Sequence, residues 1–260
     1  MTIRSHAKVN IFLKITGLRG NYHELSSRFM QVKGLFDTLS FMPKEKVDDD
    51  FMLQGSFGCQ TEKNTIYKAW SILKEHTKNQ RLDDFFKHYA VVVEKKIPEF
   101  AGLGGGSSNA AAFMKLCNKT CKLNLDKQTL AQLGSKIGAD VPFFIYDYPS
   151  ANVSGIGEIV KPFEEDLLDI KTFTPPIKGD TAQVYNAFRK NHIQEIPQNA
   201  SLASCMEKEK SNAIMEKYTI QEANDLFAPA LYLYPQLQNH VKEGWFFSGS
   251  GSTFFTTQKV

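Results

Sequence analysis

A run of four glycines in five residues constrains this 260-residue chain more than any other feature of its sequence. The run is Gly102-Leu103-Gly104-Gly105-Gly106, and Ser107-Ser108-Asn109-Ala110-Ala111-Ala112 follows it directly. Serine and asparagine favour helix N-termini, and successive alanines favour a helix interior. The sequence therefore predicts a loop that leads straight into the N-terminus of a helix.

This loop and helix together have the properties of a phosphate-binding site. Glycine lets the backbone approach a ligand closely, because it carries no Cβ atom. A helix N-terminus adds unpaired N–H groups and roughly half a unit of positive charge. A flexible surface turn is the alternative, but a leucine between the glycines and the alanine-rich helix after them argue against it. We therefore favour the interpretation that residues Pro98–Ser108 form a phosphate-binding loop.

Two common phosphate loops do not fit this sequence. A Walker loop needs Gly-Lys-Ser or Gly-Lys-Thr at the start of the helix, and the triplet does not occur here. A dinucleotide-binding fingerprint needs a glycine where Ser107 stands and an acid about 20 residues later, at the end of a strand. Asp126 has that distance, but its surroundings predict a helix N-cap.

The composition argues against several other classes of protein. The formal net charge of +3 gives no strong basic field of the kind that nucleic-acid-binding proteins carry. No apolar run approaches the roughly 20 residues that a membrane span needs, and the N-terminus lacks the apolar core of a signal peptide. We expect a cytoplasmic protein that binds neither nucleic acid nor membrane.

Cys117 and Cys121 are the one pair of residues that suggests a metal site. They lie four apart on a predicted helix and share a face. No second pair of Cys or His stands at zinc-like spacing, so we interpret them as two small buried side chains. We predict no metal site built by the protein alone.

Strand and helix patterns are mixed along the chain. Residues 6–16 alternate with a period of two, which predicts a strand, and residues 89–94 predict another. Helices are predicted to start after Asn64 and after Asp126. Residues 148–180 are richer in proline and glycine and indicate a join. The sequence predicts an α+β fold in two lobes, with domains at 1–148 and 149–260.

Four segments together resemble the galactokinase/homoserine kinase/mevalonate kinase/phosphomevalonate kinase superfamily. Pro98–Ala111 resembles its ATP loop, and Ala7-Lys8-Val9-Asn10 resembles its N-terminal signature. Gly20–Leu25 and Gly138–Phe143 resemble segments of one family within it, the 4-diphosphocytidyl-2-C-methyl-D-erythritol kinases. The order and spacing of these segments extend over most of the chain.

The resemblance implies a two-lobed small-molecule kinase fold, with an N-terminal lobe like ribosomal protein S5 domain 2 and a ferredoxin-like C-terminal lobe. It implies ATP-dependent phosphorylation of the 2-hydroxyl of 4-diphosphocytidyl-2-C-methyl-D-erythritol, in the non-mevalonate pathway to isopentenyl diphosphate. ATP is then the co-substrate, Mg²⁺ is expected with it, and the acceptor is a cytidine-diphosphate-linked small molecule. A monomer and a homodimer are both compatible with this expectation.

The resemblance also assigns the catalytic roles. Asp140 is expected to be the general base for the hydroxyl, and Lys8 to orient Asp140 and stabilise charge as the γ-phosphoryl group moves. From the residues alone, a functional acid is favoured at Asp140 over a helix or turn cap near Gly138, because the apolar segment around it offers few local reasons for an acid. Alternation along its strand by itself predicts an exposed Lys8.

Five further residues are expected at the acceptor. Asn10 shares a strand face with Lys8 and is expected to bind the erythritol hydroxyls or the diphosphate. Tyr22 and His23 are expected at the cytosine, by stacking and by hydrogen bonding. Thr181 and Tyr185 resemble the second wall of the cytidine site, although Thr181 has the alternative role of a helix N-cap.

A second glycine-rich turn, with Gly249 and Gly251, is expected beside the phosphates; a plain hairpin turn is the alternative and is compatible with that role. The residues expected to bind ATP are Pro98, Glu99, Phe100, Ala101, Gly102, Leu103, Gly104, Gly105, Gly106, Ser107 and Ser108.

Two other functions remain open from the sequence. The first is another kinase of the superfamily, acting on homoserine or mevalonate, against which Tyr22, His23 and the segment Gly138–Phe143 argue. The second is a non-catalytic RNA-binding module, because the N-terminal lobe of the superfamily resembles an RNA-binding fold. The balanced charge and the presence of both Lys8 and Asp140 oppose that alternative.

Overall fold

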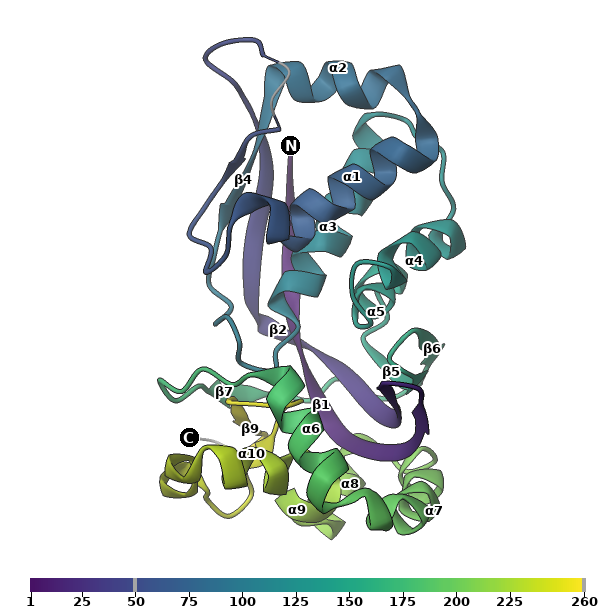
Figure 1. Cartoon of the computed structure of the whole chain (residues 1–260), viewed down its shortest axis with the longest axis vertical. Helices are drawn as coiled ribbons and strands as arrows, with labels where there is room; N and C mark the ends of the chain where they lie inside the picture. Colours follow the sequence, from purple (N-terminus) through teal and green to yellow (C-terminus); the bar gives the residue numbers. More distant parts are fainter. Residues whose placement is uncertain (49–50, 259–260) are drawn as a thin grey trace. The chain divides into compact units, whose positions relative to one another are not determined.

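The computed structural model describes residues 1–48 and 51–258 (Figure 1). The chain forms two compact units, and neither is a single stretch of sequence. Unit 1 consists of Met1–Ala7, Leu35–Ile97 and Gly105–Asp147, and unit 2 of Lys8–Gly34, Pro98–Gly104 and Tyr148–Val260. One boundary between the units therefore falls at the predicted join near residue 148, whereas two earlier segments belong to unit 2. The assignment of folding domains to 1–148 and 149–260 stays a prediction.

Two long strands open the chain and pair with each other. They are β1 (Thr2–Arg19) and β2 (Tyr22–Pro43), so the predicted strand is confirmed and is longer than expected. Every residue from position 7 to position 15 is buried, including Lys8, which is only 4% exposed. The prediction of an exposed Lys8 from alternation alone is wrong, because both faces of β1 are buried over this stretch.

In unit 1 the second half of β2 pairs antiparallel with β4 (Tyr89–Glu94), and β4 pairs with the short β3 (Leu53–Gln54). The helical elements of this unit are η1 (Thr61–Lys63), α1 (Thr65–Thr77), α2 (Gln80–His88), α3 (Gly105–Thr120), α4 (Lys127–Ser135) and α5 (Val141–Tyr146). Phe41 of β2, Phe86 of α2 and Phe113 of α3 pack ring against ring in its core. Cys117 and Cys121 are buried, as expected.

Two helices of unit 1 begin at the N-cap residues that the sequence predicts. Asn64 accepts a hydrogen bond from the N–H of Ile66 and begins α1. Asp126 accepts from the N–H of Thr129 at 2.7 Å and begins α4. α3 begins at Gly105, so the glycine run does lead directly into a helix N-terminus.

In unit 2 the first half of β2 pairs with β5 (Ser150–Gly155), and β5 pairs with β6 (Ile159–Pro162). A second sheet has the order β7 (Lys171–Phe173), β9 (Phe254–Thr256), β8 (Phe246–Phe247). The helical elements are α6 (Thr181–Asn191), η2 (Ile193–Glu195), α7 (Ile196–Met206), α8 (Ser211–Lys217), α9 (Ile220–Ala223), α10 (Phe227–Leu233) and η3 (Pro235–His240). Within the described residues, no helix combines the length and apolar character needed to cross a bilayer.

Candidate active site

Lys8 and Asn10 belong to a buried chain of hydrogen bonds in unit 2. Lys8 Nζ donates to Asn10 Oδ1 at 2.7 Å, and Asn10 Nδ2 donates to Ser27 Oγ at 2.9 Å. The Ser27 hydroxyl gives its own proton to the carbonyl of Phe12 at 2.5 Å. Because that proton is committed, Ser27 can only accept from Asn10, and the Asn10 amide oxygen is left facing Lys8. The Lys8 ammonium also lies 4.5 Å from the centre of the Phe29 ring.

Asp140 occupies the N-cap position of α5 in unit 1, but its side chain makes no capping hydrogen bond. The Asp140 side chain therefore does not cap α5. Its segment lies beside the start of α3, because a Cβ atom placed on Gly138 would be 3.5 Å from Ser107 Oγ. The backbone two residues before Asp140 is thus next to the predicted phosphate-binding helix.

The first half of the predicted ATP loop, Pro98–Gly104, packs against the second glycine-rich turn within unit 2. Ser248 Oγ donates to the Gly102 carbonyl at 2.9 Å, and the Thr253 N–H donates to the Ala101 carbonyl. The N–H of Lys8 donates to the Leu103 carbonyl at 3.0 Å, so the same loop also contacts β1. Pro98, Glu99 and Phe100 are exposed on its outer side.

The second glycine-rich turn also approaches Asn10. A Cβ atom on Gly249 would lie 3.4 Å from Asn10 Oδ1, and one on Gly251 would collide with the ring of Phe247. The structure therefore brings the loop 98–104, the turn with Gly249 and Gly251, and the Lys8–Asn10 pair together in unit 2.

The second half of the ATP loop forms the first turn of α3 in unit 1. Gly106 is exposed there, and its carbonyl accepts a hydrogen bond from Thr65 Oγ1 at 2.7 Å. Ser107 is half-buried, whereas Ser108 is buried and its hydroxyl accepts from Ser5 Oγ at 2.7 Å. The N–H groups of this first turn have no partner within the helix and are suited to phosphate oxygens.

His23 has a buried ring with an unsatisfied nitrogen in unit 2. Its ring centre is 5.0 Å from that of Tyr185 and 6.0 Å from that of Phe188. Nε2 is buried and, in the part of the chain that the structure describes, has no hydrogen-bond partner. Burial, and then the positive charge of Arg189, lower the pKa of His23, so the imidazole is neutral at pH 7. A neutral ring with an open nitrogen is suited to the edge of a base.

Tyr22, which directly precedes His23, and Thr181 also belong to unit 2. Tyr22 is 64% exposed at the start of β2. Thr181 Oγ1 contacts Ser250 Oγ of the second glycine-rich turn at 2.8 Å. The N-cap of α6 is Asp180, which accepts from the Gln183 N–H, so Thr181 is not the cap.

Two residues of the site have no signal in the sequence analysis. Ser27 fixes the Asn10 amide, as described above. Arg189 of α6 donates to the Gly20 carbonyl at 3.2 Å and to the Tyr22 carbonyl at 3.5 Å, which holds the turn that precedes His23. Both act on partners distant in sequence, so a reading of local patterns cannot find them.

Mg²⁺ is the metal that the family resemblance implies. Among the described residues, no group of three or more His, Cys, Asp or Glu side chains is arranged to hold a metal ion. Mg²⁺ bound to ATP keeps several waters and needs only one or two protein ligands. The Ser107 hydroxyl and the Asp140 carboxylate of unit 1 are hard oxygen donors that fit this small requirement.

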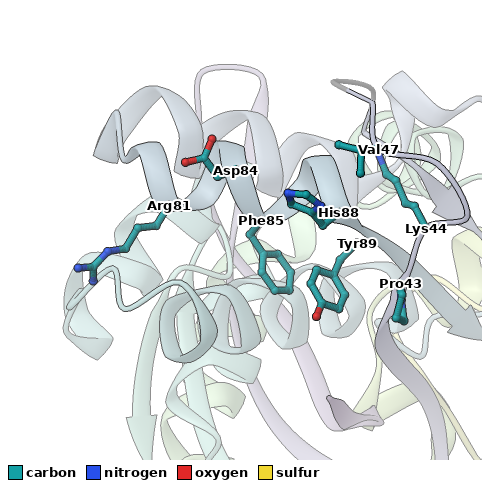
Figure 2. Close-up of a pocket in the computed structure, with 8 residues that line it drawn as sticks. All are labelled: Pro43, Lys44, Val47, Arg81, Asp84, Phe85, His88 and Tyr89. Carbon is teal, nitrogen blue, oxygen red and sulfur yellow. The ribbon is translucent and has the colours of Figure 1, made fainter.

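A separate surface cavity of about 570 Å³ lies in unit 1 and contains none of the predicted site residues. Figure 2 shows Phe85 and Tyr89 side by side within it, and their rings stack at 4.5 Å. Its lining consists of Pro43, Lys44, Val47, Arg81, Asp84, Phe85, His88 and Tyr89. These residues belong to the end of β2, to the segment 44–48 after it, to α2 and to the start of β4, so the cavity is distinct from the predicted ATP loop.

Known proteins resemble this chain over almost its whole length. The N-terminal domain model of the GHMP kinases matches residues 64–148. A 4-diphosphocytidyl-2-C-methyl-D-erythritol kinase from Sulfurimonas denitrificans is 52% identical over 259 residues, covering 98% of this chain and 96% of that protein. The chain belongs to this kinase family.

Further relatives and a solved structure support the same family assignment. 4-Diphosphocytidyl-2-C-methyl-D-erythritol kinases from Sulfurovum sp. and Campylobacter jejuni are 49% and 38% identical, covering 98% and 99% of this chain and 98% and 100% of those proteins. A crystal structure of a 4-(cytidine 5'-diphospho)-2C-methyl-D-erythritol kinase matches all of this chain and 90% of that one, with a TM-score of 0.71 at 29% identity.

A mevalonate kinase from Methanococcus jannaschii matches all of this chain and 90% of that one, with a TM-score of 0.63 at 14% identity, which shows a shared fold alone. The predicted α+β kinase fold and the family resemblance are confirmed. As a member of the 4-diphosphocytidyl-2-C-methyl-D-erythritol kinase family, the chain is a phosphotransferase that uses ATP as co-substrate.

Proposed function

We propose that this chain transfers the γ-phosphoryl group of ATP to the 2-hydroxyl of 4-diphosphocytidyl-2-C-methyl-D-erythritol, in the non-mevalonate pathway to isopentenyl diphosphate. The observation that carries the proposal is the 52% identity to a kinase of that name, which extends over 98% of this chain. The products are ADP and the 2-phosphorylated acceptor.

The loop Pro98–Ser108 binds the ATP phosphates in this proposal. Its support is the glycine-rich backbone of the first half and the N-terminal turn of α3 in the second half. Mg²⁺ accompanies the phosphates and supplies the charge neutralisation that phosphoryl transfer needs.

Asp140 accepts the proton of the 2-hydroxyl, so that the hydroxyl oxygen of the acceptor can attack the γ-phosphorus while ADP leaves. Its support is an acid that does not cap its helix and whose segment lies beside the first turn of α3. Lys8 stabilises the negative charge that passes through the γ-phosphoryl group. Its support is a buried ammonium held by Asn10.

The acceptor binds to residues of unit 2 in this proposal. Asn10 contacts the erythritol or diphosphate part, and Gly249 and Gly251 lie beside the phosphates. The cytosine binds at His23, whose open nitrogen and neighbouring Tyr185 support the assignment. Tyr22 stacks on the base, and Thr181 and Tyr185 form the second wall of the cytidine site.

The remaining parts of the proposal concern the location, oligomeric state, partners and folding domains of the protein. The enzyme is cytoplasmic, acts as a monomer or homodimer, and binds its small-molecule substrates without nucleic acid or membrane. Its folding domains are residues 1–148 and 149–260. Size-exclusion chromatography with light scattering measures the oligomeric state directly.

A coupled ADP-release assay with purified protein tests the function. We expect ATP-dependent turnover of the cytidyl acceptor and none of mevalonate or homoserine, the substrates of other kinases in the superfamily. Turnover of mevalonate without turnover of the cytidyl acceptor contradicts the proposal.

The variant Asp140→Asn tests the mechanism. If Asp140 is the base, kcat falls by ~10²-fold or more while ATP affinity is kept, because only the proton transfer is lost. The matched control is Asp147→Asn, which changes the acid at the other end of α5, where the residue is in the left-handed conformation that asparagine tolerates. A kcat for Asp140→Asn equal to that of the control shows that Asp140 is not the base.

A further inference from the structure

Asp37 of β2 is a buried carboxylate that contacts both ends of the predicted ATP loop. The side chain is 0% exposed. Oδ1 accepts from the N–H groups of Lys96 and Ile97, at 2.7 and 2.8 Å. Oδ2 accepts from Lys95 Nζ at 2.5 Å and from Asn109 Nδ2 at 2.9 Å. Residues 95–97 directly precede the loop, and Asn109 directly follows it.

The network continues from Asn109 into the first turn of α3. Asn109 Oδ1 accepts from Lys95 Nζ at 3.0 Å, and Nδ2 also donates to Ser5 Oγ at 2.8 Å. Ser5 Oγ then donates to Ser108 Oγ at 2.7 Å. The residue before the loop and the first turn after it are thus connected through one carboxylate, and all of these atoms belong to unit 1.

The two ends of the loop are also in close contact. A Cβ atom on Gly105 would lie 2.9 Å from Ile97 Cγ2, so the chain leaves at Ile97 and returns at Gly105 with little space between them. Close contact between Ile97 and Gly105 fixes the position of the N-terminus of α3. The direction of the N–H groups in the first turn of α3 therefore depends on this contact.

The chemistry of the site requires a carboxylate. All four groups that face Asp37 are donors, and an ionised carboxylate is a side chain that only accepts. An asparagine at this position could still accept from two donors, but its NH₂ group would face Lys95 Nζ and Asn109 Nδ2, which are donors themselves. Two donors would then lack a partner in a buried place.

We propose that Asp37 is a positioning residue for the nucleotide, which holds the two ends of the loop so that the first turn of α3 presents its N–H groups to the ATP phosphates. Asp37 itself does not touch ATP. The proposal rests on the proposed function, since it takes Pro98–Ser108 as the ATP loop.

The test compares Asp37→Asn with Glu165→Gln. Glu165 is a matched control in unit 2, because it is a carboxylate 3% exposed that also accepts four hydrogen bonds. Its donors are Arg28 Nη1, Ser150 Oγ, Ser211 Oγ and the Ser211 N–H. Each variant removes one charge from a buried carboxylate that accepts four hydrogen bonds, and only the partners of Asp37 include the ends of the loop.

Titration calorimetry with ADP and Mg²⁺ measures nucleotide affinity without an acceptor, so its result stands even if the chain phosphorylates a different alcohol. We expect Asp37→Asn to weaken ADP binding by roughly tenfold or more, because the lost bonds fix the phosphate-binding turn. The KM of the cytidyl acceptor should stay within about twofold. Glu165→Gln should lower the melting temperature without changing ADP affinity.

Equal loss of ADP affinity in both variants, or unchanged ADP affinity in folded Asp37→Asn, overturns the proposal. If Asp37→Asn does not fold, Ser5→Ala takes its place, because it removes only the hydroxyl between Asn109 and Ser108. We then expect ADP binding roughly threefold weaker, for the loss of one hydrogen bond. Unchanged ADP affinity in Ser5→Ala also overturns the proposal.

Discussion

Gly102 and Gly106 lie four residues apart in the same loop, yet the protein surrounds them differently. Gly102 has a φ of +75°, and a Cβ atom there would be 2.0 Å from the carbonyl oxygen of Ser248. Gly106 lies in the first turn of α3, and a Cβ atom there would make only ordinary contact, at 3.5 Å, with Thr65 Oγ1.

The difference distinguishes a glycine that the backbone packing requires from a glycine that ligand binding requires. At position 102, the fold itself requires glycine, since the loop and the second glycine-rich turn touch backbone to backbone. At position 106 the fold would prefer alanine, which is better than glycine in a helix by roughly 1 kcal/mol. Close approach of a phosphate is the physical reason that remains for a glycine at position 106.

The largest effect that this comparison predicts is that of Gly102→Ala. A left-handed alanine costs about 1–2 kcal/mol, and the collision with Ser248 adds to that cost. We expect a large drop in melting temperature and in the yield of folded protein, measured by thermal unfolding. A melting temperature equal to that of the unchanged protein contradicts the requirement for glycine here.

Gly106→Ala should behave in the opposite way. Stability is kept or slightly raised, whereas the added methyl group lies where the phosphates approach, so the KM for ATP rises roughly tenfold, the equivalent of ~1.4 kcal/mol. Steady-state kinetics and thermal unfolding measure the two quantities on the same sample. The control is Gly34→Ala, because among the described residues, apart from its two chain neighbours, no atom lies within 4 Å of a Cβ atom at position 34. An unchanged KM for ATP in Gly106→Ala removes the ligand-based reason for this glycine.

Ser27→Ala extends the comparison to the Lys8–Asn10 pair, which belongs to unit 2. Without the hydroxyl, the Asn10 amide can turn and present its NH₂ group to Lys8. Loss of one hydrogen bond is worth about 1 kcal/mol, so we expect kcat to fall roughly fivefold. Ser26→Ala is the matched control, because Ser26 Oγ donates to Glu207 instead. Equal kcat values for the two variants would show that Ser27 does not position Asn10.

The smallest predicted effect concerns His23, which the protein leaves with an open nitrogen. Burial and Arg189 lower its pKa below the ordinary 6.5, so the folded chain resists protonation. As pH falls below 6.5, the unfolded chain binds a proton that the folded chain does not, and folding stability is lost. The free energy of unfolding should therefore decrease more between pH 7 and pH 5 than it does in His23→Gln. Parallel pH dependence in the two proteins would show that His23 is not held neutral by the fold.

Several parts of the fold follow from residues close together in the sequence. The helix start at the glycine run and the caps of α1 and α4 are all local. Each of the two caps, Asn64 and Asp126, depends on a side chain and a backbone N–H within three residues. The prediction of a strand at Tyr89–Glu94 is also confirmed, because the β-branched residues of that segment favour a strand locally. The local pattern failed for Lys8, whose burial depends on the rest of the protein.

The sequence by itself therefore determined the family, and its short motifs predict the phosphate loop and the candidate catalytic residues. Only the tertiary structure decided what holds those residues in place. Asp37 acts on residues about 60 positions away, Ser27 on Asn10 of another strand, and Arg189 on a turn 169 residues earlier. The physical reason is that a buried polar side chain must find its partners in space, and folding brings those partners from distant parts of the chain.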